Sequence, residues 1–200
     1  MRYHRGDVVQ RALEVLDDYG LADLTMRRLG SELGVQPSAL YHHFANKQTL
    51  LAAVADEILA RGLGDGHPGE PGEPEMPREQ GEWDARLRTV CRRLRDAMLA
   101  WRDGAELVAT VHAFGLGAHA AYEAVDDALV GSGLPAGLRA TAARTLLHLV
   151  FGHTGEEQTR LQASSAGAID AEPPHSSDFD AGLALLIDGI RVRVGQPTTR

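Results

Sequence analysis

Two adjacent histidines stand beside a tyrosine in the stretch QPSALYHHFANK, residues 36–47. Imidazole and phenol groups suit two kinds of site: a metal centre, or a surface that contacts the phosphates and bases of nucleic acid. On a helix, His42 and His43 point about 100° apart, and no further histidine follows at the i+4 spacing with which a helix grips one ion. The stretch therefore favours nucleic-acid binding, and we expect no metal there.

The elements that would position these side chains follow from helix signals. Pro37 suits the first turn of a helix that runs to about His43, with Leu40 facing inward. The preceding helix begins after Thr25, a good N-cap, and stops at Gly34. Two helices joined by so short a turn are typical of a helix-turn-helix, whose second helix enters the major groove of DNA.

Helical periodicity continues along the chain without sustained strand alternation, so we predict an all-α fold. A first helix, with Asp7 placed to cap it, is expected to end at Tyr19 and to complete an N-terminal three-helix helix-turn-helix domain. A fourth helix, capped by Asn46, follows these three, and the domain spans residues 1–61. The tract 62–82, rich in Gly, Pro and Glu, predicts a flexible loop, and 163–178 is a second break. A larger helical domain at 83–200 is expected to hold helices over 83–101, near 105–110, and over 117–130, 136–160 and 178–194.

Composition excludes several classes of protein. No apolar run approaches the ~20 residues of a membrane helix, and the first residues lack the apolar region of a signal peptide, so we expect a cytoplasmic protein with no membrane partner. Cys91 is the only cysteine, which rules out an internal disulfide and predicts a small buried hydrophobe. The net charge of -8 argues against a protein that coats nucleic acid, but it allows a DNA reader with local basic groups.

The stretch ALEVLDDYGLADLTMRRLGSELGVQPSALYHHFANKQTLLAAVADEIL resembles the DNA-binding domain of the tetracycline-repressor (TetR) family. The pattern G-x-x-x-L-T-x-R-x-L-x-x-x-L-G-V-x-x-x-x-L-Y-x-H-x-x-N-K is matched nearly throughout and without gaps, and the resemblance covers residues 5–60. WRDGAELV, the FG-x-x-x-GEEQ stretch at 151–158 and the closing FDAGLALLIDGIRVRV are similar to the regulatory domain of the tetracycline-repressor branch. The resemblance implies a ligand-responsive transcriptional repressor without enzymatic activity or a resident cofactor.

The resemblance also implies which side chains contact double-stranded operator DNA. Tyr41 and Lys47 would anchor phosphates. Family members vary their base reading at the positions of Gln36, Ser38, Ala39 and His42. The full set of implied DNA contacts is Thr25, Arg27, Gln36, Ser38, Ala39, Tyr41, His42, His43 and Lys47.

Gly30 stands where the family usually has alanine. A glycine inside a helix costs about 1 kcal/mol relative to alanine. We expect this cost in full unless close packing of the two helices uses the space of the missing methyl group.

A single reader helix contacts only a few base pairs, so physics and the resemblance both imply a twofold homodimer with its readers about 34–36 Å apart. Its surface is expected on the apolar faces of the helices at 136–160 and 178–194, although these faces could be only intramolecular core. A small-molecule effector in the second domain would move the fourth helix and lower operator affinity, with a coupling of typically ~1–3 kcal/mol.

In the drug-binding members of the family, two histidines hold the drug and a magnesium ion, and here Leu63 and Val108 occupy those positions. An acidic residue of the drug site has its counterpart in Glu156. The replacement of the two histidines by Leu63 and Val108 argues against magnesium–tetracycline as the effector, because magnesium requires several oxygen ligands and this pocket offers few. Ligand pockets combine apolar walls with a few polar groups, although each histidine could equally be a core or surface residue. The candidates are Trp101, His112, Phe114, His119, His148, Phe151, His153 and Glu156.

Two other functions stay open. An all-helical enzyme could use His148, His153 and Glu156 as a metal or acid–base site, but the chain has no HExxH motif, no nucleophile beside a base and no phosphate loop. A transcriptional activator or a ligand-independent regulator of the same fold is also compatible, because the position of the operator decides the sign of regulation. The sequence does not name the effector, the operator or the regulated genes.

Overall fold

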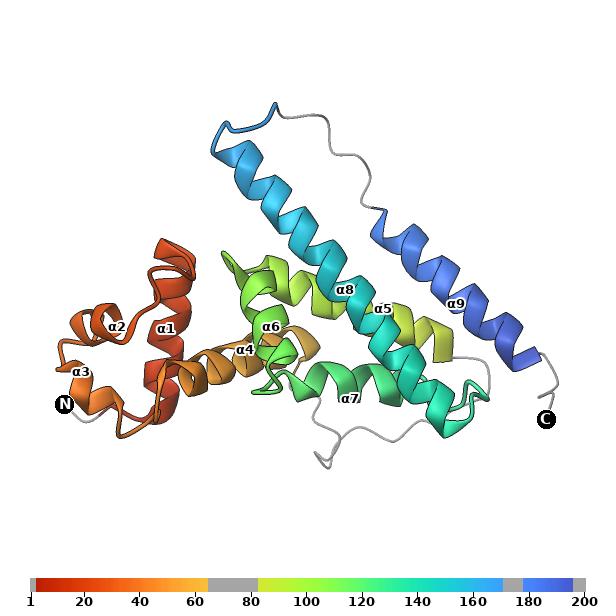
Figure 1. Cartoon of the computed structure of the whole chain (residues 1–200), viewed down its shortest axis with the longest axis horizontal. Helices are drawn as coiled ribbons and strands as arrows, with labels where there is room; N and C mark the ends of the chain where they lie inside the picture. Colours follow the sequence, from red (N-terminus) through yellow and green to blue (C-terminus); the bar gives the residue numbers. More distant parts are fainter. Residues whose placement is uncertain (1–2, 65–82, 171–177, 196–200) are drawn as a thin grey trace. The chain divides into compact units, whose positions relative to one another are not determined.

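The computed structural model describes residues 3–64, 83–170 and 178–195, and all regular secondary structure in these ranges is α-helical (Figure 1). The all-α prediction is confirmed for this part of the chain. The helices are α1 (Arg5–Tyr19), α2 (Met26–Glu32), α3 (Pro37–Leu40), α4 (Lys47–Leu63), α5 (Trp83–Leu99), α6 (Gly104–Ala113), α7 (His119–Ala128), α8 (Ala136–Ser165) and α9 (Phe179–Gly195).

The helices form two compact units. Unit 1 comprises residues 1–62 and 96–120, and unit 2 comprises 63–95 and 121–200. Helices α5 and α7 each begin in one unit and end in the other, so both cross the division. The division predicted from the sequence, at residues 61 and 83, stays a prediction.

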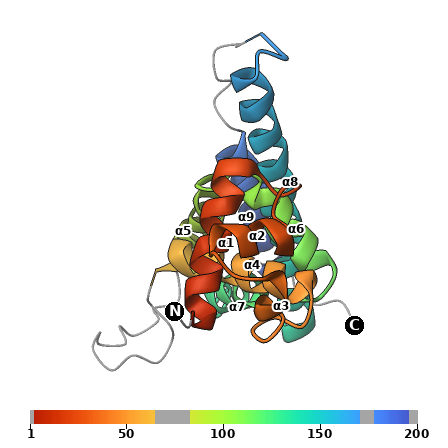
Figure 2. The same ribbon diagram turned by 90° about the vertical axis from the view of Figure 1, so that its left-hand side faces the viewer.

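Unit 1 contains the helix-turn-helix, and its α1, α2 and α3 face the viewer in Figure 2. The apolar stripe of α1 is buried as its periodicity predicts, with Val8, Leu13 and Leu16 at 0 % exposure. Phe44, four residues after the end of α3, is also buried in the core, at 2 % exposure. These contacts provide the support on which α3 lies.

The helix boundaries in unit 1 follow the predicted caps, with two differences. Thr25 Oγ1 accepts the Arg28 N–H at 3.1 Å, and Asn46 Oδ1 accepts the Thr49 N–H at 2.8 Å, as expected for N-caps. Helix α1 begins two residues before Asp7, whose carboxylate accepts the His4 N–H at 2.7 Å. Helix α3 ends at Leu40 and not near His43.

Unit 2 is built around α8, which runs antiparallel beside α9 in Figure 1. Cys91 on α5 is fully buried as predicted, and burial raises the pKa of its thiol to about 12. Helix α8 continues to Ser165, past the predicted start of the second break. The remaining parts of the two predicted loops, 65–82 and 171–177, lie outside the described residues. No helix within the described ranges is long and apolar enough to cross a membrane.

Candidate nucleic-acid interface

The turn between α2 and α3 is unusually close. Val35 donates its N–H to the Gly30 carbonyl at 2.9 Å, and Gly34 has a φ of +65°, which favours glycine. A Cβ atom on Gly30 would lie 2.9 Å from the Val35 carbonyl oxygen, nearer than side chains tolerate. The space of the missing methyl group is therefore occupied by the turn: glycine at position 30 lets the turn pass close to α2. This close packing offsets the cost of glycine in helix propensity.

Helix α3 is short and is anchored by one side chain. Pro37 occupies its first turn as expected, and Leu40 is its one buried residue, at 2 % exposure. Beyond Leu40 the chain continues in tight turns, in which His43 and Phe44 both donate their N–H to the Leu40 carbonyl at 2.9 and 3.0 Å. These turns hold Tyr41, His42 and His43 in place although they lie outside the regular helix.

The side chains around Leu40 face solvent. Tyr41 is 51 % exposed, although a tyrosine ring is large and apolar. His43 is half-buried. The exposed predicted readers are Gln36, Ser38, Ala39, Tyr41 and His42. They present an amide, hydroxyls, a methyl group and an imidazole, which are groups that hydrogen-bond or contact base edges.

Three further predicted DNA contacts, Arg27, Lys47 and Thr25, precede or follow this surface in the sequence. Arg27 is exposed in the first turn of α2, and Lys47 is half-buried at the start of α4. Neither forms an ion pair with any described residue. Thr25 is half-buried, and its hydroxyl oxygen serves as the cap of α2. The Arg27 and Lys47 side chains therefore remain available to phosphate oxygens, and contacts of this kind do not depend on the base sequence of the DNA.

The local charge differs from that of the chain. The net charge is -8, yet no Asp or Glu occurs between Glu32 and Asp56. Glu32 itself is neutralised by Arg11, whose guanidinium lies 3.1 Å from its carboxylate. An acid-free segment of this kind lets a protein with net negative charge approach the phosphate backbone.

The candidate effector residues of unit 1 differ in their exposure to solvent. Trp101 is half-buried with the Arg61 guanidinium 5.4 Å from its ring centroid. His112 is half-buried in α6. Phe114 is 69 % exposed and His119 is exposed.

In unit 2 the predicted candidates also divide between core and surface. Phe151 is buried, whereas His148 and Glu156 are exposed, and Glu156 pairs with Arg160 at 2.8 Å. His153 is half-buried, and its ring lies edge-on to Phe179 at 5.4 Å. These candidates therefore stay predictions.

Sequence reasoning missed the partly buried ion pair of unit 2. Arg95 on α5 donates two hydrogen bonds to the Glu157 carboxylate, one of them at 2.8 Å, and its guanidinium lies 5.5 Å from the Phe179 ring centroid. The Nδ1 atom of His153 lies 3.9 Å from the same carboxylate and has no hydrogen-bond partner. Nothing in the local sequence distinguishes Glu157 from its neighbour Glu156, because the ion pair joins two residues that are 62 positions apart.

The described residues hold no group of three His, Cys, Asp or Glu side chains that could bind a metal ion. Val108 is fully buried and Leu63 half-buried at the two positions where drug-binding relatives are expected to have histidine. Neither aliphatic side chain can ligate a metal ion.

Two family models match the chain. Residues 8–54 match the bacterial regulatory proteins of the tetR family, and residues 74–177 match the tetracyclin repressor-like C-terminal domain. Among curated proteins, the chain is 32% identical to the tetracycline repressor protein class A from transposon 1721 of Escherichia coli, over 93% of this chain and 89% of the relative.

Solved structures agree with this assignment. The chain is 40% identical to Mycobacterium smegmatis BioQ, with a TM-score of 0.81 over 96% of this chain and 99% of BioQ. It is equally similar in sequence to BioQ solved with its double-stranded DNA operator, with a TM-score of 0.75 over 95% of this chain and 99% of that chain. The chain therefore belongs to the tetR family of bacterial regulatory proteins and is a ligand-responsive, DNA-binding transcriptional repressor, not an enzyme.

Proposed function

We propose that this repressor reads its operator through the surface formed by α3 and the turns that follow it. The observation that carries the proposal is the exposure of polar side chains around the single buried anchor, Leu40, in an acid-free segment. The proposed phosphate contacts are Thr25, Arg27, Tyr41, His43 and Lys47. The proposed base-reading residues are Gln36, Ser38, Ala39 and His42.

The test begins with a selection of binding sites from a random double-stranded DNA library by the full-length protein. We expect a palindromic consensus that the protein binds far more tightly than unrelated duplex. Tyr41→Ala combined with Lys47→Ala should abolish this binding and leave the circular dichroism spectrum unchanged, because both side chains lie outside the core. Unchanged affinity in the double variant, or no selected sequence at all, would refute the proposed surface.

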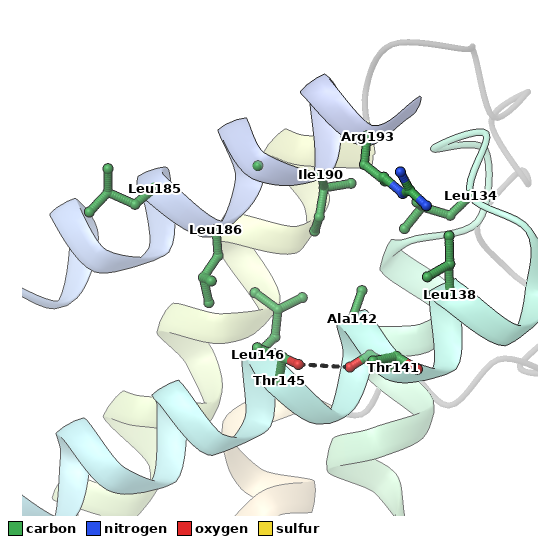
Figure 3. A pocket seen from close by; sticks show the side chains of 11 residues that line it. Leu134, Leu138, Thr141, Ala142, Thr145, Leu146, Leu185, Leu186, Ile190 and Arg193 are labelled. Carbon is green, nitrogen blue, oxygen red and sulfur yellow. Dashed lines mark hydrogen bonds between the residues drawn. The ribbon is translucent and has the colours of Figure 1, made fainter. Parts of the chain in front are cut away.

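We also propose that the repressor acts as a homodimer joined through α8 and α9. Between these helices lies a groove of about 270 Å³ whose lining is almost entirely apolar (Figure 3). The groove is lined by Leu134, Leu138, Thr141, Ala142, Thr145, Leu146, Leu185, Leu186, Gly189, Ile190 and Arg193. Leu185 is 75 % exposed at its rim. An apolar surface on two long helices is what a second copy would cover in a closed twofold dimer, and a dimer supplies the second reader that a palindromic operator requires.

The effector is proposed to be a small molecule held by the C-terminal residues that match the repressor-like domain. None of the eight candidate residues lines the groove between α8 and α9, so one region could bind the effector while the other forms the dimer. Helix α5 begins in unit 2 and ends in unit 1, and α7 begins in unit 1 and ends in unit 2, so a shift of either helix would reach the unit that contains the helix-turn-helix. A cytoplasmic location is proposed because the operator DNA of a bacterial regulator lies there.

A further inference from the structure

The first residue of α1 lies against the segment that follows α3. The Cζ atom of Arg5 is 4.8 Å from the centroid of the Phe44 ring. Phe44 is buried and donates its N–H to the Leu40 carbonyl, so its ring is fixed one turn after the buried anchor of α3. Arg5 itself is exposed. The stack therefore holds a cationic group beside the segment that carries Tyr41 and Lys47.

The Lys and Arg side chains of unit 1 fall into groups by their partners. Arg102 donates to the Asp18 backbone carbonyl at 3.3 Å. Those that pair with a carboxylate are Arg11, Arg28 and Arg61. Those that form no ion pair or hydrogen bond with any other residue in the described ranges are Arg5, Arg27 and Lys47. Arg27 and Lys47 are proposed phosphate contacts, and Arg5 is like them in having no carboxylate partner among the described residues.

We infer that Arg5 is a further phosphate-contacting residue of the operator complex, an inference that rests on the proposed function of the α3 surface. Stacking on an aromatic ring leaves the planar edge of a guanidinium, with its N–H donors, free to bind phosphate oxygens, and it restrains the side chain before DNA arrives. Such a contact adds affinity without sequence preference.

The dependence of binding on salt tests this inference. The operator selected above is titrated with wild-type protein, Arg5→Ala and Arg5→Lys at several KCl concentrations, with fluorescence anisotropy as the readout. Each lost phosphate contact lowers the slope of log K against log[salt] by about 0.9, so Arg5→Ala should lower the slope of a dimer by about 2. Affinity for an unrelated duplex should fall by a similar factor. Arg5→Lys should keep the slope, since it keeps the charge.

Two controls separate the possible outcomes. Arg160→Ala removes an exposed arginine of α8 that already pairs with Glu156, and it should leave the slope unchanged. If Arg5→Ala lowers the melting temperature or the affinity but keeps the slope, Arg5 has only a structural role and the inference is overturned. If the slope is unchanged in Arg5→Ala but falls in Lys47→Ala, the α3 surface stands without Arg5. Wild-type protein that selects no duplex refutes the proposed function itself.

Discussion

The carboxylate of Asp103 accepts the backbone N–H of Leu21 at 2.7 Å, which joins the residue before α6 to the turn between α1 and α2. In the segment after α6, directly before α7, the carboxylate of Asp56 on α4 accepts the Ala118 N–H, also at 2.7 Å. Asp103 and Ala118 are the two non-glycine residues with positive φ in the described ranges, at 55° and 62°. The segments before and after α6 are therefore fixed, one to the turn between α1 and α2 and the other to α4, at residues whose backbone geometry is uncommon for residues other than glycine.

The Asp103→Ala variant should loosen the turn between α1 and α2. Loss of the carboxylate leaves the partly buried Leu21 N–H without its acceptor, which costs about 1–3 kcal/mol, and alanine tolerates a positive φ less well than aspartate. Hydrogen exchange measured by NMR should show faster exchange of the Leu21 amide. Asp103→Asn keeps an acceptor and should restore most of the protection. Equal protection in wild type and Asp103→Ala would contradict the importance of this hydrogen bond.

Gly30→Ala should impair operator binding more than it impairs folding. The added methyl group must displace the Val35 carbonyl and with it the start of α3, while the gain in helix propensity of about 1 kcal/mol offsets part of the strain. We expect a change of a few degrees in melting temperature and a clear loss of operator affinity.

Gly152→Ala is the matched control for Gly30→Ala. Gly152 lies in α8, where an added Cβ would meet nothing within 4 Å, so this variant should gain stability with operator affinity unchanged. A Gly30→Ala protein that behaves in the same way would disprove the steric role of Gly30.

Ser38→Ala and Lys47→Ala should weaken binding in different ways. The exposed Ser38 hydroxyl is proposed to contact a base edge, so its loss should cost about 1–3 kcal/mol at one base pair of each half-site and relax selectivity there. Lys47 is proposed to contact phosphate, so its loss should weaken all duplexes about equally. Competition assays with operators that carry single base-pair changes separate the two patterns. Identical profiles for both variants would remove the distinction between base-reading and phosphate-anchoring positions.

Leu185→Glu should convert the dimer into a monomer. The side chain is 75 % exposed at the rim of the groove, so a carboxylate costs the isolated chain little but would place a charge within the proposed apolar interface. Light scattering after size exclusion should give about twice the 21.5 kDa of one chain for wild type and 21.5 kDa for the variant. Leu161→Glu, at an exposed position of α8 outside the groove, should stay dimeric. A monomeric wild-type protein would end the proposal.

Alkaline pH should destabilise the fold through Cys91. Burial raises the thiol pKa from 9.0 to about 12 in the folded chain. Its contribution is therefore complete below pH 9 and is lost as the pH rises from 9 to 12, because the unfolded chain alone releases the proton there. Each pH unit in this window lowers the free energy of unfolding by up to about 1.4 kcal/mol. Urea melts between pH 8 and 10.5 should show this slope in wild type and a smaller one in Cys91→Ala.

The sequence predicted what depends on local signals. Thr25 and Asn46 act as caps because the residues they bond are three positions away, and the apolar stripe of α1 is buried because periodicity reports its face. The end of α3 was placed too late, since tight turns after Leu40 resemble a continuing helix in sequence.

Long-range partners could not be predicted in this way. The Leu21–Asp103 bond joins residues 82 positions apart, and no residue pattern announces it. The effector candidates were chosen by residue type, which does not distinguish the buried Phe151 from the exposed His148 three positions earlier. At Gly30 the sequence left two alternatives open, a full cost in helix propensity or close packing, and the approach of the Val35 carbonyl supports close packing.

The single anchor of α3 has a bearing on how such a protein acquires new targets. Leu40 is the one buried residue of α3, so the exposed positions Ser38, Ala39, Tyr41 and His42 beside it can be exchanged without disturbing the hydrophobic contacts that maintain the fold. DNA recognition and folding thereby depend on different residues of one short segment. Natural drift or deliberate library design could thus retarget the protein to another promoter while its scaffold stays intact.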